Sequence, residues 1–97
     1  MEPLFNLGRV VSTPGALEAL ERNATHPIQL LRRHATGDWG ELCDEDKEAN
    51  KSALTTGARL MSVYTLPDNT KIWIITEAEI DQKQNRYATT ILLPEEY

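Results

Sequence analysis

The hydrophobic pattern of this chain changes its period close to Gly57, and that change restricts the fold more than any other feature. Before Gly57 the apolar residues recur at the spacing of helices that bury one face. After it come apolar runs rich in β-branched and aromatic residues, separated by polar turn segments. A helical half followed by a stranded half predicts an α+β fold, with helices packed on a mainly antiparallel sheet.

Three short helices are expected in the first half, because each of three segments has its own start and stop signals. The start signals are Thr13 with Pro14, Thr25 or His26 with Pro27, and Asp44; the stop signals are Asn23, Gly37 and Gly57.

Strands are expected over residues 59–66, 71–77 and 87–93, forming a C-terminal antiparallel meander. Residues 4–12 can add a fourth strand, which Gly8 weakens. The run 71–77 is apolar on both faces, so it should be the central strand and bury Trp73 on at least one face. We find no linker or composition break, and therefore expect one domain over residues 1–97.

Composition and charge narrow the class of protein. The net charge of -5 argues against direct nucleic-acid binding, since phosphate contacts need a basic surface, and leaves a protein partner of unknown identity as the expectation. A single cysteine excludes an internal disulfide and favours a cytoplasmic location. No apolar run approaches the roughly 20 residues of a membrane span, and the N-terminus lacks the pattern of a signal peptide.

Ionisable residues are densest between the second and third helices, at residues 33–41. His34, Asp38 and Glu41 are the clustered groups that could carry acid–base chemistry, and Trp39, Asp38 and Glu41 are the candidate binding residues. The competing interpretation is structural: His34 ends a helix, Asp38 satisfies turn amides, Glu41 points to solvent and Trp39 anchors the loop. Gly37 would close the helix in a left-handed conformation, and Gly40 would allow a close backbone approach.

The acidic stretch over residues 38–48 matches no calcium-loop spacing and lacks a zinc ligand set, so we expect neither a metal nor a cofactor. Acidic residues at the start of a helix are favoured by its dipole in any case. Cys43 lies among carboxylates and is not expected to be a nucleophile. Glu95, Glu96 and Tyr97 form a short acidic tail that could dock a partner or fray.

Four segments together resemble a family of small bacterial plasmid-related proteins, sometimes labelled as type I restriction methylase subunits. They are LGRVVSTPGALEAL (7–20), RHATGDWG (33–40), IWIITEA (72–78) and TTILLPEEY (89–97). The resemblance covers nearly the whole chain and implies carriage on plasmids or other mobile elements, but no named activity. The chain is too short for a methyltransferase domain and has no Gly-rich cofactor loop. It departs from the family pattern at residues 79–86, where the connection is longer.

Two functions remain open. The first is a non-catalytic protein-interaction or regulatory module of a mobile genetic element; the second is a small hydrolase or nuclease that uses His34, Asp38 and Glu41. An enzyme needs these three side chains to converge on an open cleft, whereas an interaction module does not. A small sheet also leaves two open edges, so a homodimer formed by edge pairing or by packing of an apolar face is expected.

Overall fold

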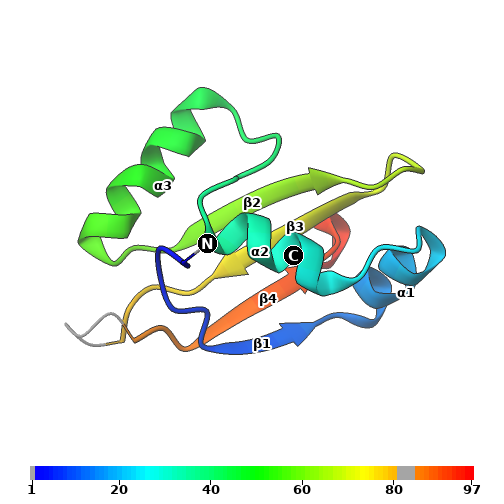
Figure 1. Cartoon of the computed structure of the whole chain (residues 1–97), viewed down its shortest axis with the longest axis horizontal. Coiled ribbons are helices and arrows are strands. Elements are labelled where there is room, and N and C mark those ends of the chain that lie inside the picture. Colours follow the sequence, from blue (N-terminus) through cyan, green and yellow to red (C-terminus); the bar gives the residue numbers. More distant parts are fainter. Residues whose placement is uncertain (1, 81–84) are drawn as a thin grey trace.

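The structure, a computed structural model, describes residues 2–80 and 85–97. It has the predicted α+β architecture, with a four-stranded sheet and three helices, of which the third lies beside one edge of the sheet (Figure 1). The elements are β1 (Arg9–Ser12), α1 (Pro14–Arg22), α2 (Pro27–Ala35), α3 (Asp44–Thr56), β2 (Leu60–Thr65), β3 (Lys71–Thr76), β4 (Ala88–Leu92) and the 3-10 turn η1 (Pro94–Glu96).

The helices begin and end where their capping residues predict, with one correction. The Thr13 hydroxyl accepts a hydrogen bond from the amide of Ala16 at the start of α1, and His26 Nδ1 accepts one from the amide of Ile28 at the start of α2. Gly57 ends α3 in the left-handed region, at φ 82°. The N-cap of α3 is Cys43 rather than Asp44, and its side chain makes no capping hydrogen bond.

The sheet order is β1-β4-β3-β2, so β3 is central as predicted. Strands β2, β3 and β4 form the antiparallel meander, whereas β1 pairs with β4 in parallel. The first strand is shorter than the predicted 4–12. Gly8 has φ +66°, so the chain leaves the extended conformation at this point. A Cβ at Gly8 would lie 2.2 Å from the carbonyl oxygen of Arg86, so only glycine fits there. Residues before the bend leave the sheet, and the amide of Leu4 donates to the carbonyl of Ala35 in α2.

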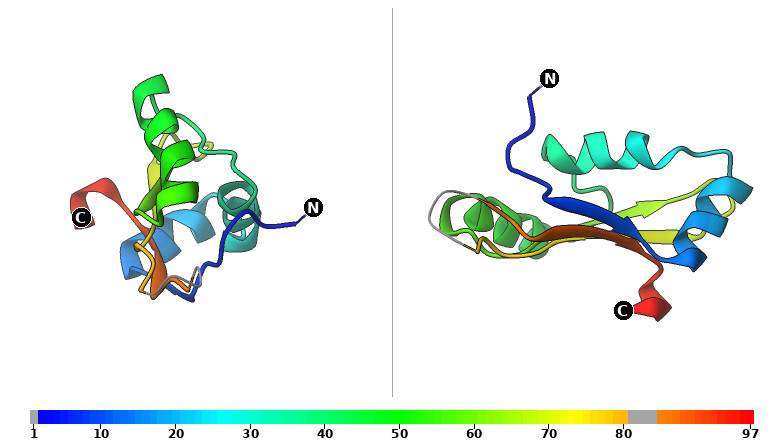
Figure 2. Two further views of the ribbon diagram at one scale, coloured as in Figure 1. Left: turned by 90° about the vertical axis from the view of Figure 1, so that its left-hand side faces the viewer. Right: turned by 90° about the horizontal axis from the view of Figure 1, so that it is seen from below.

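Helices α1 and α2 cover one face of the sheet, and the opposite face carries the C-terminal turn (Figure 2). The main core lies under the two helices, where Leu20 and Leu30 pack with Tyr64, Ile72 and Ile74. Trp73 points to the other face. It is half-buried, with its ring 5.6 Å from that of Tyr97 in an edge-on contact, so it is covered on one face by the folded-back tail.

The outer edge of β2 is covered, contrary to the expectation of two open edges. Asn50 of α3 places its side-chain amide against Met61: Nδ2 donates to the carbonyl at 2.7 Å, and Oδ1 accepts from the amide at 3.2 Å. Two residues further along, Val63 exchanges backbone hydrogen bonds with Trp39 and Glu41. These contacts take the places that a neighbouring strand would occupy.

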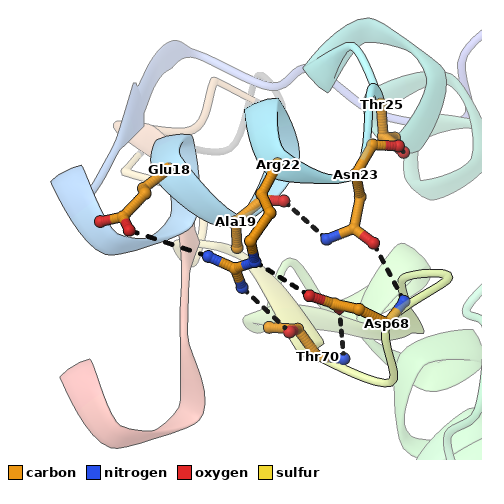
Figure 3. A network of polar contacts seen from close by, with 7 residues as sticks. All are labelled: Glu18, Ala19, Arg22, Asn23, Thr25, Asp68 and Thr70. Carbon is orange, nitrogen blue, oxygen red and sulfur yellow. Dashed lines mark hydrogen bonds and ion pairs between the residues drawn. The ribbon is translucent and has the colours of Figure 1, made fainter.

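A polar network joins the end of α1 to the turn between β2 and β3 (Figure 3). Arg22 donates to Asp68 at 3.0 Å and to Thr70 at 3.3 Å, and Asn23 Oδ1 accepts from the amide of Asp68. Hydrogen bonds from Thr70, followed by those from Arg22, hold the pKa of Asp68 well below its usual value. The network is exposed, so it fixes the position of the hairpin turn more than it adds stability.

Candidate functional site

Residues 33–41 comprise the end of α2 and the first part of the connection to α3, which runs along β2, and Asp38 organises its turn. The Asp38 carboxylate accepts from Arg33 Nε at 2.7 Å and from the amide of Gly40 at 3.2 Å. The guanidinium of Arg33 is the largest cause of a lowered pKa at Asp38. The Tyr64 hydroxyl donates to the Asp38 carbonyl at 2.7 Å, and burial raises the pKa of Tyr64 to about 12. Asp38 is thus engaged with its own loop.

The two glycines of this connection have the predicted roles. Gly37 follows α2 with φ +89°. Gly40 has φ +71°, and a Cβ there would meet the carbonyl oxygen of Val63 at 1.9 Å, so glycine is required for the contact with β2.

Trp39 anchors the connection to a second, smaller core. Its ring is buried, stacked on Phe5 at 6.2 Å and edge-on to His34 at 5.7 Å. Leu42 and Leu60 belong to the same cluster. The indole therefore presents no open platform for a ligand.

His34 is fully buried, and both of its ring nitrogens have hydroxyl partners. Nδ1 lies 2.5 Å from Ser62 Oγ and Nε2 lies 2.9 Å from Thr76 Oγ1, which in turn lies 2.8 Å from Thr89 Oγ1. The last hydroxyl donates to the carbonyl of Leu7 at 2.6 Å.

That final carbonyl sets the direction of the whole chain of hydrogen bonds. The Thr89 proton is used on Leu7, so Thr76 donates to Thr89 and accepts from the ring. The His34 ring therefore donates from Nε2, and because burial keeps the ring neutral, Ser62 donates to Nδ1. Burial, reinforced by the charge of Arg86, lowers the pKa of His34 to about 3.

Glu41 lies at the surface beside β2 and β3. Its carboxylate accepts from Lys71 Nζ at 2.7 Å and from the Thr65 hydroxyl, and these hydrogen bonds lower its pKa, that from Lys71 most. His34, Asp38 and Glu41 therefore have separate partners: the imidazole is sealed in the core, while the carboxylates are paired at the surface. The geometry does not bring the three together as one acid–base site.

Arg86 is a buried cation that the sequence pattern did not identify, since it falls in the predicted polar loop 81–86, whose first four residues lie outside the described part of the chain. Its guanidinium donates to the carbonyl oxygens of Ala53, Ala58 and Glu77, joining the end of α3 to the end of β3. Its carboxylate partner, Glu79, is 3.9 Å away. A basic residue in a polar segment carries no local signal of burial, so only the tertiary contacts reveal this role.

An apolar groove of about 510 Å³ lies between the N-terminal segment and α2. Its floor and walls include Phe5, Leu7, Leu31 and Ala35, with Ile28 exposed at its edge. Ile28, Leu31 and Ala35 are three and four residues apart and so share one helical face, but this spacing gives no indication that the sheet would leave part of that face uncovered. Arg32 is the ionisable residue in the lining, which contains no acidic side chain.

The other segments that the sequence singled out as candidate sites do not line this groove. Among the described residues, no three His, Cys, Asp or Glu side chains are grouped to hold a metal ion, so the acidic stretch over residues 38–48 offers no such site. Cys43 is exposed at the start of α3. The tail folds back on its own chain: Glu96 binds the hydroxyl of Thr13, and Arg59 donates to the Tyr97 hydroxyl at 2.9 Å.

Comparison with known proteins gives no match to a family description, to a curated protein or to a solved structure. Within residues 2–80 and 85–97, no helix is long and apolar enough to cross a membrane.

Proposed function

We propose that this chain is a non-catalytic protein-interaction module whose groove beside α2 takes an apolar segment of a protein partner. The observation that carries the proposal is the chemistry of the groove. It offers mainly aliphatic and aromatic contact surface with one cation, Arg32, and its lining contains no His, Cys, Asp or Glu; the Thr36 hydroxyl in the lining donates to the carbonyl of Arg32. Such a surface can bind and orient a partner, but has no group to transfer a proton.

The charge around the groove indicates what the partner carries. The protein as a whole has a net charge of -5, yet this lining contains a guanidinium and no carboxylate. A segment with apolar side chains and a nearby carboxylate would bury the former against Leu31 and Ile28 and pair the latter with Arg32. The partner we propose is therefore a protein with an acidic, apolar segment.

The setting we propose, a plasmid or another mobile genetic element, rests on the family resemblance of the sequence. In that setting the module would regulate a protein of the element or of its host by occupying the partner's segment. The role requires no reaction on the module itself.

A pair of matched variants tests the groove. Ile28 and Leu17 are both exposed aliphatic residues on helices, at 45% and 49%, but Leu17 does not line the groove. Glutamate at either position should leave the melting temperature nearly unchanged, since neither side chain is buried. A partner captured from cells that carry the gene should be purified and its Kd measured. We expect Ile28→Glu to weaken binding about ten-fold or more, and Leu17→Glu to leave it unchanged.

Equal binding to wild type and Ile28→Glu would overturn the assignment to this groove, and so would the failure of wild type to retain any partner. The same substitution in the intact element gives a second measurement. If the module acts through this groove, Ile28→Glu should reproduce the effect of deleting the gene on maintenance of the element, whereas Leu17→Glu should not.

A further inference from the structure

Strand β1 has an open outer edge, unlike β2. In Figure 1 no described helix or strand lies outside β1, and in the right-hand view of Figure 2 β1 faces the viewer. The amides of Arg9 and Thr13 donate to Tyr87 and Ile91 on the β4 side. Backbone groups alternate in direction along a strand, so those of Val10 and Ser12 point away from the sheet.

The exposed strand has only some of the usual features that prevent edge pairing: it is short, at four residues, and begins with Arg9. It contains no proline and no lysine, and its two central side chains, Val10 and Val11, are 44% and 38% exposed on opposite faces. Proteins that keep an edge unpaired commonly use very short strands, charged side chains, proline or a bulge. Here the middle is apolar and β-branched, which suits a paired strand.

We propose that two copies of this chain associate by antiparallel pairing of their β1 strands, with Val11 on the two-fold axis. The outward-pointing backbone groups belong to Val10 and Ser12, so these residues must meet the same groups of the second copy. With Val11 opposite Val11, Val10 lies opposite Ser12 of the partner subunit, and each such pair exchanges two hydrogen bonds. The two sheets then become one continuous sheet.

Charge complementarity selects this register over the neighbouring one. With Val11 on the axis, Arg9 lies opposite Thr13 of the partner subunit, and the Thr13 hydroxyl is bound to the carboxylate of Glu96. Arg9 and the C-terminal turn lie on the same face of the sheet, so each exposed Arg9 would meet a Glu96 carboxylate. With Val10 on the axis instead, Arg9 would face Val11 and the two ion pairs would be lost.

The register gives a sharp test by disulfide trapping in a Cys43→Ser background, which removes the natural thiol. Residues opposite each other in a non-hydrogen-bonded antiparallel pair have Cα atoms about 4.5 Å apart, within the range of a disulfide. Val11→Cys should therefore form a cross-linked dimer in a glutathione redox buffer. Val10→Cys, of similar exposure, is the control: its two copies would be about 8–9 Å apart, beyond the distance a disulfide spans.

Two solution measurements complete the test. Wild type should show twice the 11.0 kDa chain mass in light scattering at micromolar concentration, and Arg9→Glu should shift the equilibrium to monomer about ten-fold. Arg9 is exposed and outside the core, so this variant should melt as wild type does. A monomeric wild type would overturn the proposal, and equal cross-linking of Val10→Cys and Val11→Cys would overturn the register. The groove variant Ile28→Glu should stay dimeric, so that failure of partner binding and failure of self-association are distinguishable.

Discussion

The imidazole of His34 is held neutral by its surroundings, and this single ring connects protonation to stability. It is enclosed by hydroxyl partners with no carboxylate among them, and Arg86 adds a positive charge nearby. A protonated ring would have to be buried without a counter-ion, which is costly. The native fold therefore excludes a proton that the unfolded chain accepts readily.

We predict that stability falls as the pH is lowered from about 7 to about 5, by about 2 kcal/mol through His34 alone. Above pH 6.5 the ring is neutral in both states. Below it, the unfolded ring is protonated while the folded ring, with a pKa of about 3, stays neutral, so lower pH favours unfolding. Urea titrations at several pH values measure the effect.

His34→Gln is the matched comparison, because an amide keeps a donor and an acceptor but does not titrate. This variant should be less stable at pH 7 and lose about 2 kcal/mol less than wild type on going to pH 5. Identical slopes for wild type and His34→Gln would show that the ring is not buried as a neutral group.

Gly40 is the second residue on which the connection depends. We predict that Gly40→Ala costs about 3 kcal/mol in the free energy of unfolding, since it combines left-handed strain with a backbone clash against Val63. Gly37→Ala shares the positive φ, but its nearest neighbour is the flexible end of Leu4, so about 1 kcal/mol is expected. Chemical denaturation of both variants measures the difference, and equal costs would argue against the close approach.

At the scale of the elements, α3 protects the sheet as well as packing beside it. The Asn50 side chain forms one hydrogen bond with the carbonyl of Met61 and one with its amide, so these two backbone groups of β2 are not available to pair with another chain. We predict that Asn50→Ala lowers stability by about 1–2 kcal/mol and speeds amide exchange at Met61. Hydrogen exchange followed by NMR measures the second effect.

Asn50→Asp separates the two hydrogen bonds. The carboxylate still accepts from the Met61 amide but cannot donate to its carbonyl, so that amide should stay protected in this variant and lose protection in Asn50→Ala. Unchanged exchange at Met61 in the alanine variant would contradict the role of Asn50.

The helix ends and the antiparallel meander could be predicted from the sequence because their signals are local. Thr13, His26 and Gly57 act within one turn of their own helix. The imidazole–hydroxyl chain, the Asn50 contact and the burial of Arg86 could not, because each joins segments far apart along the chain. The parallel pairing of β1 with β4 could not be predicted either, because these strands lie at opposite ends of the chain.

The candidate site shows the same division. The turn role of Asp38 and the anchoring role of Trp39 were among the interpretations that residue types allowed. The groove was not, since its walls come from the N-terminal segment and α2, which meet only in the folded chain. The sequence shows that a residue is apolar, but not whether another helix or strand packs over it in the folded chain.

At the scale of the whole molecule, the sheet is asymmetric in both of its dimensions. One face lies under α1 and α2 while the other carries the C-terminal turn. One edge is occupied by Asn50 and the 39–41 connection, while no element of residues 2–80 and 85–97 covers the other (Figures 1 and 2). The groove is lined by α2 and by the segment that ends at Gly8, whereas the β1 edge begins at Arg9, so the proposed partner binding and the proposed self-association use neighbouring but different residues.

The occupied edge of β2 also limits growth. A sheet with two open edges can grow indefinitely, as in fibrils, because every added copy exposes a new unpaired edge strand. In this protein, pairing of two copies would use the open β1 edge of each copy. The two outer edges of the combined sheet would then be β2 strands, which are already covered. In the proposed dimer, Asn50 and the 39–41 connection would therefore limit growth by strand addition to a closed pair.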